Sequence, residues 1–376
     1  MSQTYDPLSR AERAGLELRG LYERYGYRKY RMGQFEEYSL YMDNKNFLSS
    51  ENVIVFTDLD GRLMALKPDI TLSIVRHAAK EPAAAEKLYY NETIYRPSAE
   101  SHTFKEISQM GMEYIGVIDR YATSEVLLLA AKSLEAFGLP WLLEVSDMRF
   151  VVGLLDALGL QDGLRSRALI ALGQKNRPAL TAIAAEAGLA GPDAEALAAL
   201  AGLYGPWETT LAQARGLCRS AGMAEALEEL EAICRSMTRE RAERIQLDFS
   251  LAGHTDYYNG VLLRGYLEGL PRAVLTGGRY DNILRKFGKR GGGIGFALDL
   301  SEIGRLPDRQ AGADLNLLVR YTPDADPAAV AAAVAQAADA GLRVRAMPQG
   351  EDPSGLHWER QLWVDAQGVR EGGAEV

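Results

Sequence analysis

Cysteine and histidine are scarce in this sequence, which limits the metal sites and disulfides that it can form. Two cysteines and four histidines occur among 376 residues. The cysteines show no CxxC spacing and have no histidine nearby, and no two histidines have the spacing of a ligand pair. We therefore expect no disulfide framework, no bound metal and a reducing compartment. The residues concerned are Cys218, Cys234, His77, His102, His254 and His357.

The sequence also lacks long apolar runs and any excess of positive charge. No run of about eighteen apolar residues is present, so no segment is predicted to span a membrane. The first residues, MSQTYDPLSRAER, have no apolar core of the signal-peptide kind. The formal net charge of −9 argues against a broadly basic surface for nucleic acid. We expect a cytoplasmic globular protein of roughly two or three domains.

The N-terminal part shows the pattern of a helix, a hairpin and a second helix. Residues 9–25 have amphipathic spacing, residues 53–66 form a predicted hairpin, and residues 72–80 form a predicted helix. Asp69 and Thr71 lie where the hairpin leads into that helix. Asp69 is either the N-cap of the helix or a ligand-binding group, and the sequence leaves both readings open.

A pair of strands follows, and the second has one apolar and one polar face. Residues 88–94 and 104–116 are predicted strands joined by a loop. Because strand side chains alternate, Gln109, Gly111 and Glu113 share one face, and two methionines and a tyrosine share the other. The apolar face is predicted to pack against helices. The polar face meets either water or a polar pocket, in which Gly111 would let a ligand approach the backbone.

Residues 245–303 consist of short apolar runs separated by Gly and Asn, a pattern typical of an antiparallel meander. Tyr258, Arg279, Tyr280 and Asp281 are predicted to lie at strand ends or turns, where polar side chains often surround a ligand. A single pair of tyrosines at a turn is ordinary exposed surface. Two such clusters around one meander favour a site.

The remaining segments differ in composition from these sheet-forming parts. Residues 162–237 are rich in Ala, Leu, Glu and Arg with helical spacing, and predict an all-helical insertion. Residues 311–376 predict a strand–helix–strand unit, a further strand over residues 361–365 and a Gly/Glu tail. The chain is therefore divided into a sheet-forming domain (residues 1–161 and 238–310), the insertion and a small C-terminal α/β appendage.

Several motifs in order resemble the histidyl-tRNA synthetase family over roughly residues 9–305. The resemblance implies an α+β, class II aminoacyl-tRNA synthetase-like fold, an antiparallel sheet flanked by helices, and a homodimer. The motifs are Lys67-Pro68-Asp69-Ile70-Thr71, Arg96-Pro97, Gln109-Met110-Gly111-Met112-Glu113, Asp256-Tyr257-Tyr258-Asn259-Gly260, Gly277-Gly278-Arg279-Tyr280-Asp281 and Gly295-Phe296-Ala297.

The resemblance also implies a pocket for histidine. Carboxylates suit the α-ammonium and an imidazole N–H of that ligand, and hydroxyls suit its remaining polar groups. Asp69 replaces the glutamate that is usual in the family, and its side chain is shorter. The matching positions are Asp69, Thr71, Gln109, Glu113, Tyr258 and Tyr280, with Arg96 and Arg279 as possible anion-binding residues.

The sequence departs from the synthetases at the positions that handle phosphate. Adenylation builds negative charge that enzymes neutralise with arginine and Mg²⁺. Thr93 stands where the family has one arginine, residues 252–255 offer none where it has another, and Glu302 stands where it has a third. We therefore expect no catalytic residues and almost no adenylation. The C-terminal appendage is also much shorter than an anticodon-binding domain.

These departures make the sequence more similar to the regulatory subunits of ATP phosphoribosyltransferase, which are paralogues of the synthetases. That resemblance implies a hetero-oligomer with the short catalytic subunit and histidine feedback in the first step of histidine biosynthesis, with no cofactor, tRNA or membrane. The alternative is a divergent histidine–tRNA ligase that uses ATP and Mg²⁺. A third possibility is an interaction module with an empty pocket. For the ligase, replacement cations would have to come from Lys67, Arg76, Arg96, Lys105, Arg285, Lys286, Lys289 or Arg290, although the last four also fit a solvated loop.

Overall fold

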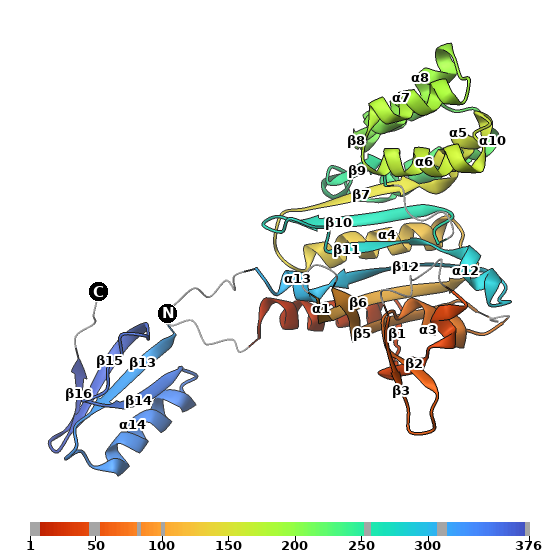
Figure 1. Ribbon diagram of the computed structural model, residues 1–376. Coiled ribbons are helices and arrows are strands. Elements are labelled where there is room, and N and C mark those ends of the chain that lie inside the picture. The colour runs from red at the N-terminus through yellow and green to blue at the C-terminus, as the bar shows by residue number, and fades with distance from the viewer. Residues whose placement is uncertain are drawn as a thin grey trace. The chain divides into compact units, whose positions relative to one another are not determined.

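The computed structural model in Figure 1 describes residues 8–44, 53–80, 84–98, 102–251, 257–306 and 314–372. The chain forms two compact units, one within residues 11–306 and one that contains residues 314–372. None of the helices in these described ranges has the length and apolar character that crossing a membrane requires.

The helices and strands alternate along the chain as an α+β protein. The helices are α1 Arg10–Arg24, α2 Ser39–Met42, α3 Thr71–His77, α4 Arg120–Glu135, α5 Met148–Ala157, α6 Asp162–Gly173, α7 Arg177–Glu186, α8 Gly191–Ala199, the 3-10 helix η2 Leu200–Gly202, α9 Trp207–Gly216, α10 Ala221–Ser236, α11 Arg239–Ala242, α12 Asp281–Lys286, α13 Leu300–Ile303 and α14 Pro327–Asp339. The strands are β1 Arg28–Lys29, β2 Phe35–Glu37, β3 Ile54–Thr57, β4 Leu63–Leu66, β5 Glu86–Ser98, β6 Thr103–Gly116, β7 Trp141–Asp147, β8 Tyr204–Pro206, β9 Ile245–Asp248, β10 Val261–Leu267, β11 Leu275–Arg279, β12 Gly292–Asp299, β13 Leu315–Tyr321, β14 Val344–Pro348, β15 Trp358–Asp365 and β16 Gly368–Gly372.

One large sheet organises the first unit. Within the described ranges its strand order is β1-β5-β6-β12-β11-β10-β7-β9-β8. Most neighbours are antiparallel, as predicted, and β1–β5 and β7–β9 are parallel. The predicted meander is confirmed for β10, β11 and β12. It is wrong for β9, because β7 lies between β9 and β10 in the sheet.

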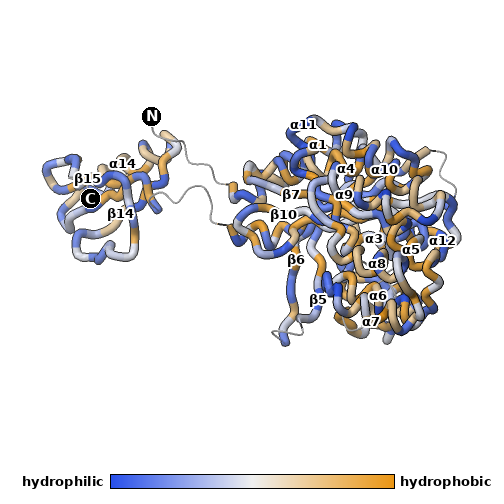
Figure 2. The backbone as a smooth tube through the Cα atoms, turned by 90° about the horizontal axis from the view of Figure 1, so that it is seen from above, coloured by the Kyte–Doolittle hydropathy of each residue, from blue (hydrophilic) through white to orange (hydrophobic). Residues whose placement is uncertain are grey.

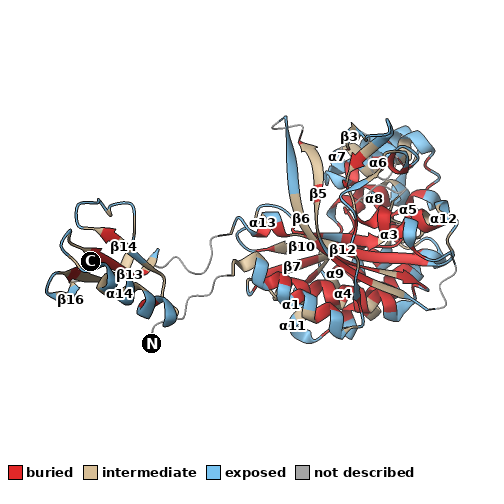
Figure 3. Cartoon of the chain, turned by 90° about the horizontal axis from the view of Figure 1, so that it is seen from below, coloured by how far each residue is buried: buried red, intermediate tan, exposed pale blue. Residues whose placement is uncertain are grey.

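The two faces of this sheet have different partners. Helices α1 and α4 cover one face, where Met110 and Met112 of β6 and Phe296 of β12 are fully buried in the core (Figures 1 and 3). This confirms that the apolar face of β6 packs against helices. Gln109 and Glu113 point to the opposite face, so that face of β6 carries the candidate site.

The hairpin before the site forms as predicted. Strands β3 and β4 pair antiparallel, with Gly61 at the turn in a left-handed conformation (φ 81°), and β2 joins them as a third strand. The chain then enters α3 directly. Helix α3 ends at His77, a little before the predicted end.

The β5–β6 hairpin is longer than predicted. Its register continues to the pair Ser98 and Thr103, so Arg96 lies in a strand rather than in a loop. The ends of β5 and β6 project away from the body of the unit (Figures 2 and 3). Arg96 pairs with Lys105, two residues before the last pair of this hairpin.

The predicted insertion is mainly helical, but it also contains a strand. Strand β8 pairs antiparallel with β9, so the prediction of an all-helical segment is wrong there. Gly205 has a φ of 137°, which lets the chain extend between η2 and α9. Lys175 fixes this strand, because its ammonium lies 3.7 Å from the Tyr204 ring centroid and 2.8 Å from Asp248.

The small unit is a four-stranded sheet with one helix. The strand order is β14-β13-β15-β16, and Leu317, Val319, Ala337 and Val364 form its core with α14. The tail predicted after residue 365 is wrong in part, because Gly368 turns the chain (φ 121°) and β16 pairs antiparallel with β15.

Candidate functional site

A buried carboxylate stands at the centre of the polar face. Glu113 of β6 is 2% exposed. The Thr71 hydroxyl donates to its Oε1 at 2.7 Å, and the Tyr280 hydroxyl donates to its Oε2 at 2.5 Å. Thr71 is the first residue of α3 and Tyr280 immediately precedes α12. Glu113 therefore joins β6 to the beginnings of two helices.

The Glu113 carboxyl group has no cation beside it among the described residues. No lysine or arginine of the described residues forms an ion pair with Glu113. Burial raises the pKa of Glu113 to about 8, although hydrogen bonds from Tyr280 and Thr71 oppose this rise. Burial therefore favours the protonated form of this carboxyl group more than water does. A ligand ammonium or N–H would favour its ionised form.

Glycine on the neighbouring strands makes room for this site. Gly295 of β12 is the register partner of Glu113, and a Cβ there would lie 1.9 Å from Glu113 Oε2. Gly278 of β11 pairs with Gly295, and its Cβ would lie 2.7 Å from the Tyr258 ring. The Glu113 and Tyr258 side chains therefore lie directly on the backbone of these strands.

Tyrosines form the wall around the carboxyl group. The rings of Tyr257 and Tyr258 meet edge to face with centroids 4.1 Å apart, and the Tyr257 and Tyr280 centroids are 6.1 Å apart. Burial raises the pKa of Tyr258, so its hydroxyl stays neutral and can donate. Tyr90 of β5 is also buried here and was not predicted. A tyrosine opposite Gly111 in the β5–β6 register is the signal that could have found it.

Asp69 lies at the edge of this cluster, one residue before the N-cap Ile70 of α3, and its role in ligand binding stays a prediction. Its Oδ1 accepts a hydrogen bond from the backbone N–H of Leu72 at 2.9 Å, as a capping residue does. Its Oδ2 lies 3.9 Å from the Arg96 guanidinium. Burial raises the pKa of Asp69, and Arg96 opposes the rise. One carboxylate oxygen is therefore engaged by the helix, and the other faces a cation.

Gln109 is not brought into the cluster. It shares a face with Glu113, but it lies four residues earlier in β6, where its register partners are Asp299 of β12 and Glu92 of β5. At the usual strand rise this is about 13 Å from Glu113. Its side chain has no hydrogen bond with a described residue, so its role in binding stays a prediction.

The two possible anion-binding arginines differ in how their charge is used. The Arg279 Nε donates to Asp281 Oδ2 at 2.9 Å, in a network that also holds Asn259. That charge is already compensated. The Arg96 Nε donates to the Pro68 carbonyl at 2.9 Å, and the rest of its guanidinium is free to face Asp69.

Comparison with known proteins identifies the family. The family described as Histidyl-tRNA synthetase matches residues 6–303. The ATP phosphoribosyltransferase regulatory subunit of Anaeromyxobacter dehalogenans (strain 2CP-C) is 34% identical over 291 residues, which cover 76% of this chain and 83% of that protein. The chain belongs to this family of regulatory subunits.

Solved structures confirm the predicted fold. A Bacillus halodurans protein described as an ATP phosphoribosyltransferase regulatory subunit/histidyl-tRNA synthetase has a TM-score of 0.77 and 22% identity, with 96% of each chain covered. The ATP phosphoribosyl transferase (HisG:HisZ) complex of Thermotoga maritima has a TM-score of 0.62 and 17% identity, with 78% of this chain and 98% of that chain covered.

At the positions where synthetases handle phosphate, this regulatory subunit has no cation to offer. Thr93 lies in β5, and Glu302 in α13 accepts from Arg305 at 3.0 Å. Lys67, 2% exposed, donates to Glu92 at 2.8 Å, so its charge is already paired. The stretch of residues 252–256, which includes His254 and Asp256, lies outside the described residues.

Metal ligands and reactive thiols are not gathered at this site. Among the described residues, no group of three or more His, Cys, Asp or Glu side chains is placed to hold a metal ion. Cys218 and Cys234 are unpaired, and burial raises the pKa of both thiols, that of Cys234 to about 12.

Proposed function

We propose that this chain is a non-catalytic regulatory subunit of ATP phosphoribosyltransferase in histidine biosynthesis. It binds the short catalytic subunit, keeps it active, and lowers its activity when histidine occupies the Glu113 site. It needs no cofactor, tRNA or membrane for this role. The family membership supports the regulatory role, and the name of the Thermotoga maritima complex supports a partnership with the catalytic subunit.

One observation carries the assignment of histidine as the ligand. Glu113 is a buried carboxyl group with two hydroxyl donors and no cation beside it. A positively charged or N–H-bearing ligand would complete this arrangement, because the buried carboxyl group can ionise favourably only if a partner compensates its charge. The resemblance to synthetases supports histidine as that ligand, with Asp69, Tyr258 and Gln109 as further proposed contacts. A homodimer in the cytoplasm is part of the same proposal.

The proposal is tested by mixing the chain with the short catalytic subunit from the same source. We expect the catalytic subunit to be nearly inactive alone, active with the chain, and inhibited again by histidine. Inhibition should saturate at the concentration at which histidine binds the free or assembled chain by calorimetry. Activity that is independent of the chain would contradict the regulatory role. Unchanged activity with saturating histidine would contradict the feedback role.

A substitution on the sheet backbone tests the position of the ligand. Gly295→Ala would place a Cβ 1.9 Å from Glu113 Oε2 and 2.3 Å from the Met112 carbonyl oxygen. We expect histidine affinity to fall at least about tenfold and the melting temperature to fall by several degrees, because the carboxyl group or the strand must move. Calorimetry and thermal unfolding measure both. Gly163→Ala is the control, because nothing lies within 4 Å of its Cβ. Unchanged histidine binding in Gly295→Ala would mean that the ligand lies elsewhere.

A divergent histidine–tRNA ligase remains the second candidate. The family match over residues 6–303 and the Glu113 cluster favour it. Thr93, Glu302 and the paired Lys67 argue against it, because each oxyanion-stabilising group that an enzyme loses costs about 3 kcal/mol of transition-state stabilisation. We expect histidine-dependent ATP–pyrophosphate exchange to stay at background. Clear exchange by the purified chain would support the ligase instead.

A further inference from the structure

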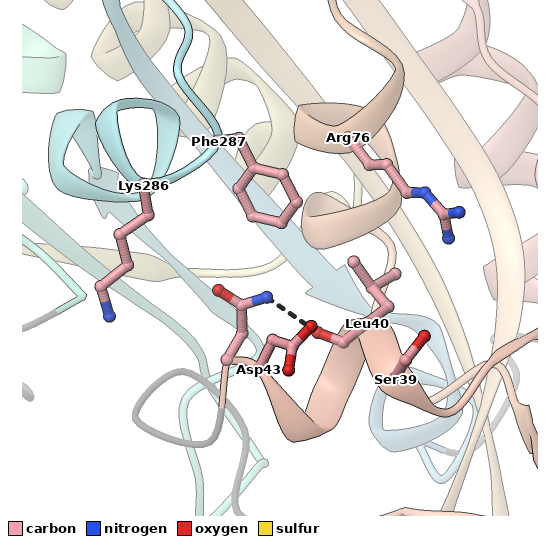
Figure 4. A pocket seen from close by; sticks show the side chains of 7 residues that line it. Ser39, Leu40, Asp43, Arg76, Lys286 and Phe287 are labelled. Atoms are coloured by element: carbon pink, nitrogen blue, oxygen red, sulfur yellow. Dashed lines mark hydrogen bonds between the residues drawn. The ribbon is translucent and has the colours of Figure 1, made fainter.

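Two short helices connect the Glu113 site to a surface pocket. Helix α3 begins with Thr71 and carries Arg76 near its end, and α12 follows Tyr280 and ends with Lys286. Arg76, Lys286 and Phe287 line one pocket of about 500 Å³ (Figure 4). Both helices therefore start at the carboxyl group of Glu113 and end at this pocket. The pocket is lined by Ser39, Leu40, Asp43, Asn44, Arg76, Lys286 and Phe287.

The two helices are tied together at both ends. At the site, Glu113 accepts from Thr71 and from Tyr280. At the pocket, the Lys289 ammonium donates to the carbonyl of Arg76 at 3.1 Å and to that of Ala78. A cation on the last carbonyls of a helix also suits the helix dipole. A displacement at Glu113 would therefore move α3 and α12 together.

The pocket combines apolar, polar and positively charged groups. Figure 4 shows the Phe287 ring and the Leu40 side chain facing its interior, with Arg76 and Lys286 on opposite sides. Asn44 is fixed by a hydrogen bond to the Leu40 carbonyl at 2.8 Å. Asp43 is the carboxylate of the lining. Such a surface can hold a partner residue that has both an apolar part and a negative charge.

Further cations lie near the ends of α3 and α12 in the sequence, and together with the two cations that line the pocket we call them the basic patch. The backbone N–H of Arg290 donates to the Lys80 carbonyl at 2.9 Å, which brings the segments after α3 and α12 side by side. Lys80 and Lys286 are exposed, and neither has an ion pair with a described carboxylate. The Arg76 guanidinium is 39% exposed and lies 3.4 Å and 3.6 Å from two glutamates. The basic patch consists of Arg76, Lys80, Arg285, Lys286, Lys289 and Arg290.

This patch is unusual for a chain with a formal net charge of −9. Acidic residues outnumber basic ones over the chain as a whole, and a cluster of cations such as this one would attract an acidic partner. Complementary charges steer association and fix the orientation of two proteins. A local positive surface with a pocket at its centre therefore fits a negatively charged protein surface.

We propose that the basic patch and the pocket of Figure 4 dock an acidic face of the catalytic subunit, and that α3 and α12 carry the state of the Glu113 site to this surface. The inference rests on the proposed function and names its interface. Histidine can change the assembly only if it binds the two states of the chain with different affinity. The paired helices are a physical element that both sites contact, which such coupling requires.

The docking surface is tested by reversing two exposed charges. We expect Lys80→Glu with Lys286→Glu to weaken binding of the catalytic subunit at least about thirty-fold at low salt, with most of the salt dependence lost. Histidine affinity of the free double variant should stay within about twofold of the unchanged chain. Arg177→Glu with Arg272→Glu is the control, because it makes the same change in net charge at two exposed positions outside the patch. Binding is measured by calorimetry or biolayer interferometry at two salt concentrations.

The outcomes separate this inference from the proposed function. If the unchanged chain binds and activates the catalytic subunit, and the patch variant behaves like its control, the docking surface is overturned and the regulatory role stands. If the unchanged chain does not bind, the proposed function itself fails. Lys80→Gln with Lys286→Gln removes the two charges without reversing them, and so tests whether the glutamate variant has lost binding through a folding defect. This milder variant should weaken binding by an intermediate factor.

The coupling through the helices has its own test. Lys289→Met keeps most of the side-chain bulk and removes the hydrogen bonds to the carbonyls of Arg76 and Ala78 at the end of α3. The measured quantity is the ratio of the dissociation constants for the catalytic subunit with and without saturating histidine. We expect this ratio to move toward one in the variant, even if docking itself weakens uniformly. An unchanged ratio would show that α3 and α12 do not carry the signal.

Discussion

Replacing Glu113 by glutamine should weaken histidine binding about 100-fold and abolish feedback inhibition. Glutamine keeps the shape of the side chain. Its Oε1 can still accept one of the Thr71 and Tyr280 hydroxyls that now donate to the carboxylate, and its Nε2 would donate to the oxygen of the other. It removes the negative charge that pairs with the ligand. Loss of one partner of a buried charge pair costs roughly 2–5 kcal/mol, so about 100-fold is at the lower end of this range. Calorimetry with histidine measures the affinity, and the assay with the catalytic subunit measures the feedback.

The control for this variant is Glu144→Gln. Glu144 of β7 is on the same face of the sheet, and it accepts from the Tyr266 hydroxyl at 3.0 Å. It therefore resembles Glu113 in chemistry but not in position. We expect its histidine affinity to match that of the unchanged chain. Equal affinity for Glu113→Gln and Glu144→Gln would remove Glu113 from the binding site, whereas activation of the catalytic subunit without histidine should survive both changes.

Histidine binding should strengthen with pH from 6 to 8 by up to about tenfold per unit. Burial raises the pKa of Glu113 to about 8, so the empty site is mainly protonated below this pH. A ligand that pairs with the ionised carboxylate must displace that proton, which costs about 1.4 kcal/mol for each pH unit below the pKa. The gain should level off near pH 8, and affinity should fall at higher pH as the histidine amino group loses its charge.

Proton release at pH 7 measures this effect directly. Calorimetry in buffers of different ionisation enthalpy gives the number of protons released when histidine binds. We expect the unchanged chain to release nearly one proton more than Glu113→Gln does when histidine binds. The comparison removes the contribution of the histidine imidazole, because both variants bind the same ligand. The same proton release from both would mean that Glu113 is already ionised in the empty site.

Local patterns in the sequence predicted most of the elements around the site. Amphipathic spacing predicted α1, the turn at Gly61 predicted the β3–β4 hairpin, and the two-residue period assigned the apolar side of β6 to the core. Each of these depends on neighbours in the chain, so they can be predicted without tertiary contacts. Element ends were less accurate, because Arg96 lies in β5 and Gly368–Gly372 forms a strand.

Long-range pairing decided the features that the sequence could not show. Strand β7 lies between β9 and β10, although the pattern favours a simple meander. Gln109 and Glu113 share a face, but only Glu113 meets the hydroxyls from α3 and from the turn before α12. Tyr90 was missed because its role depends on the register between β5 and β6. Such contacts join residues far apart in the chain, and periodicity carries no information about them.

By itself the sequence determined the family, the order of helices and strands, and the residues that could hold histidine. These follow from motifs, spacing and residue chemistry, all of which are local. Only the tertiary structure decided that Gly295 lies opposite Glu113, and that Lys289 ties the end of α3 to the segment after α12. The physical reason is that sheet register and helix packing place side chains from distant segments within hydrogen-bond reach. The site and its connection to the surface exist only in that arrangement.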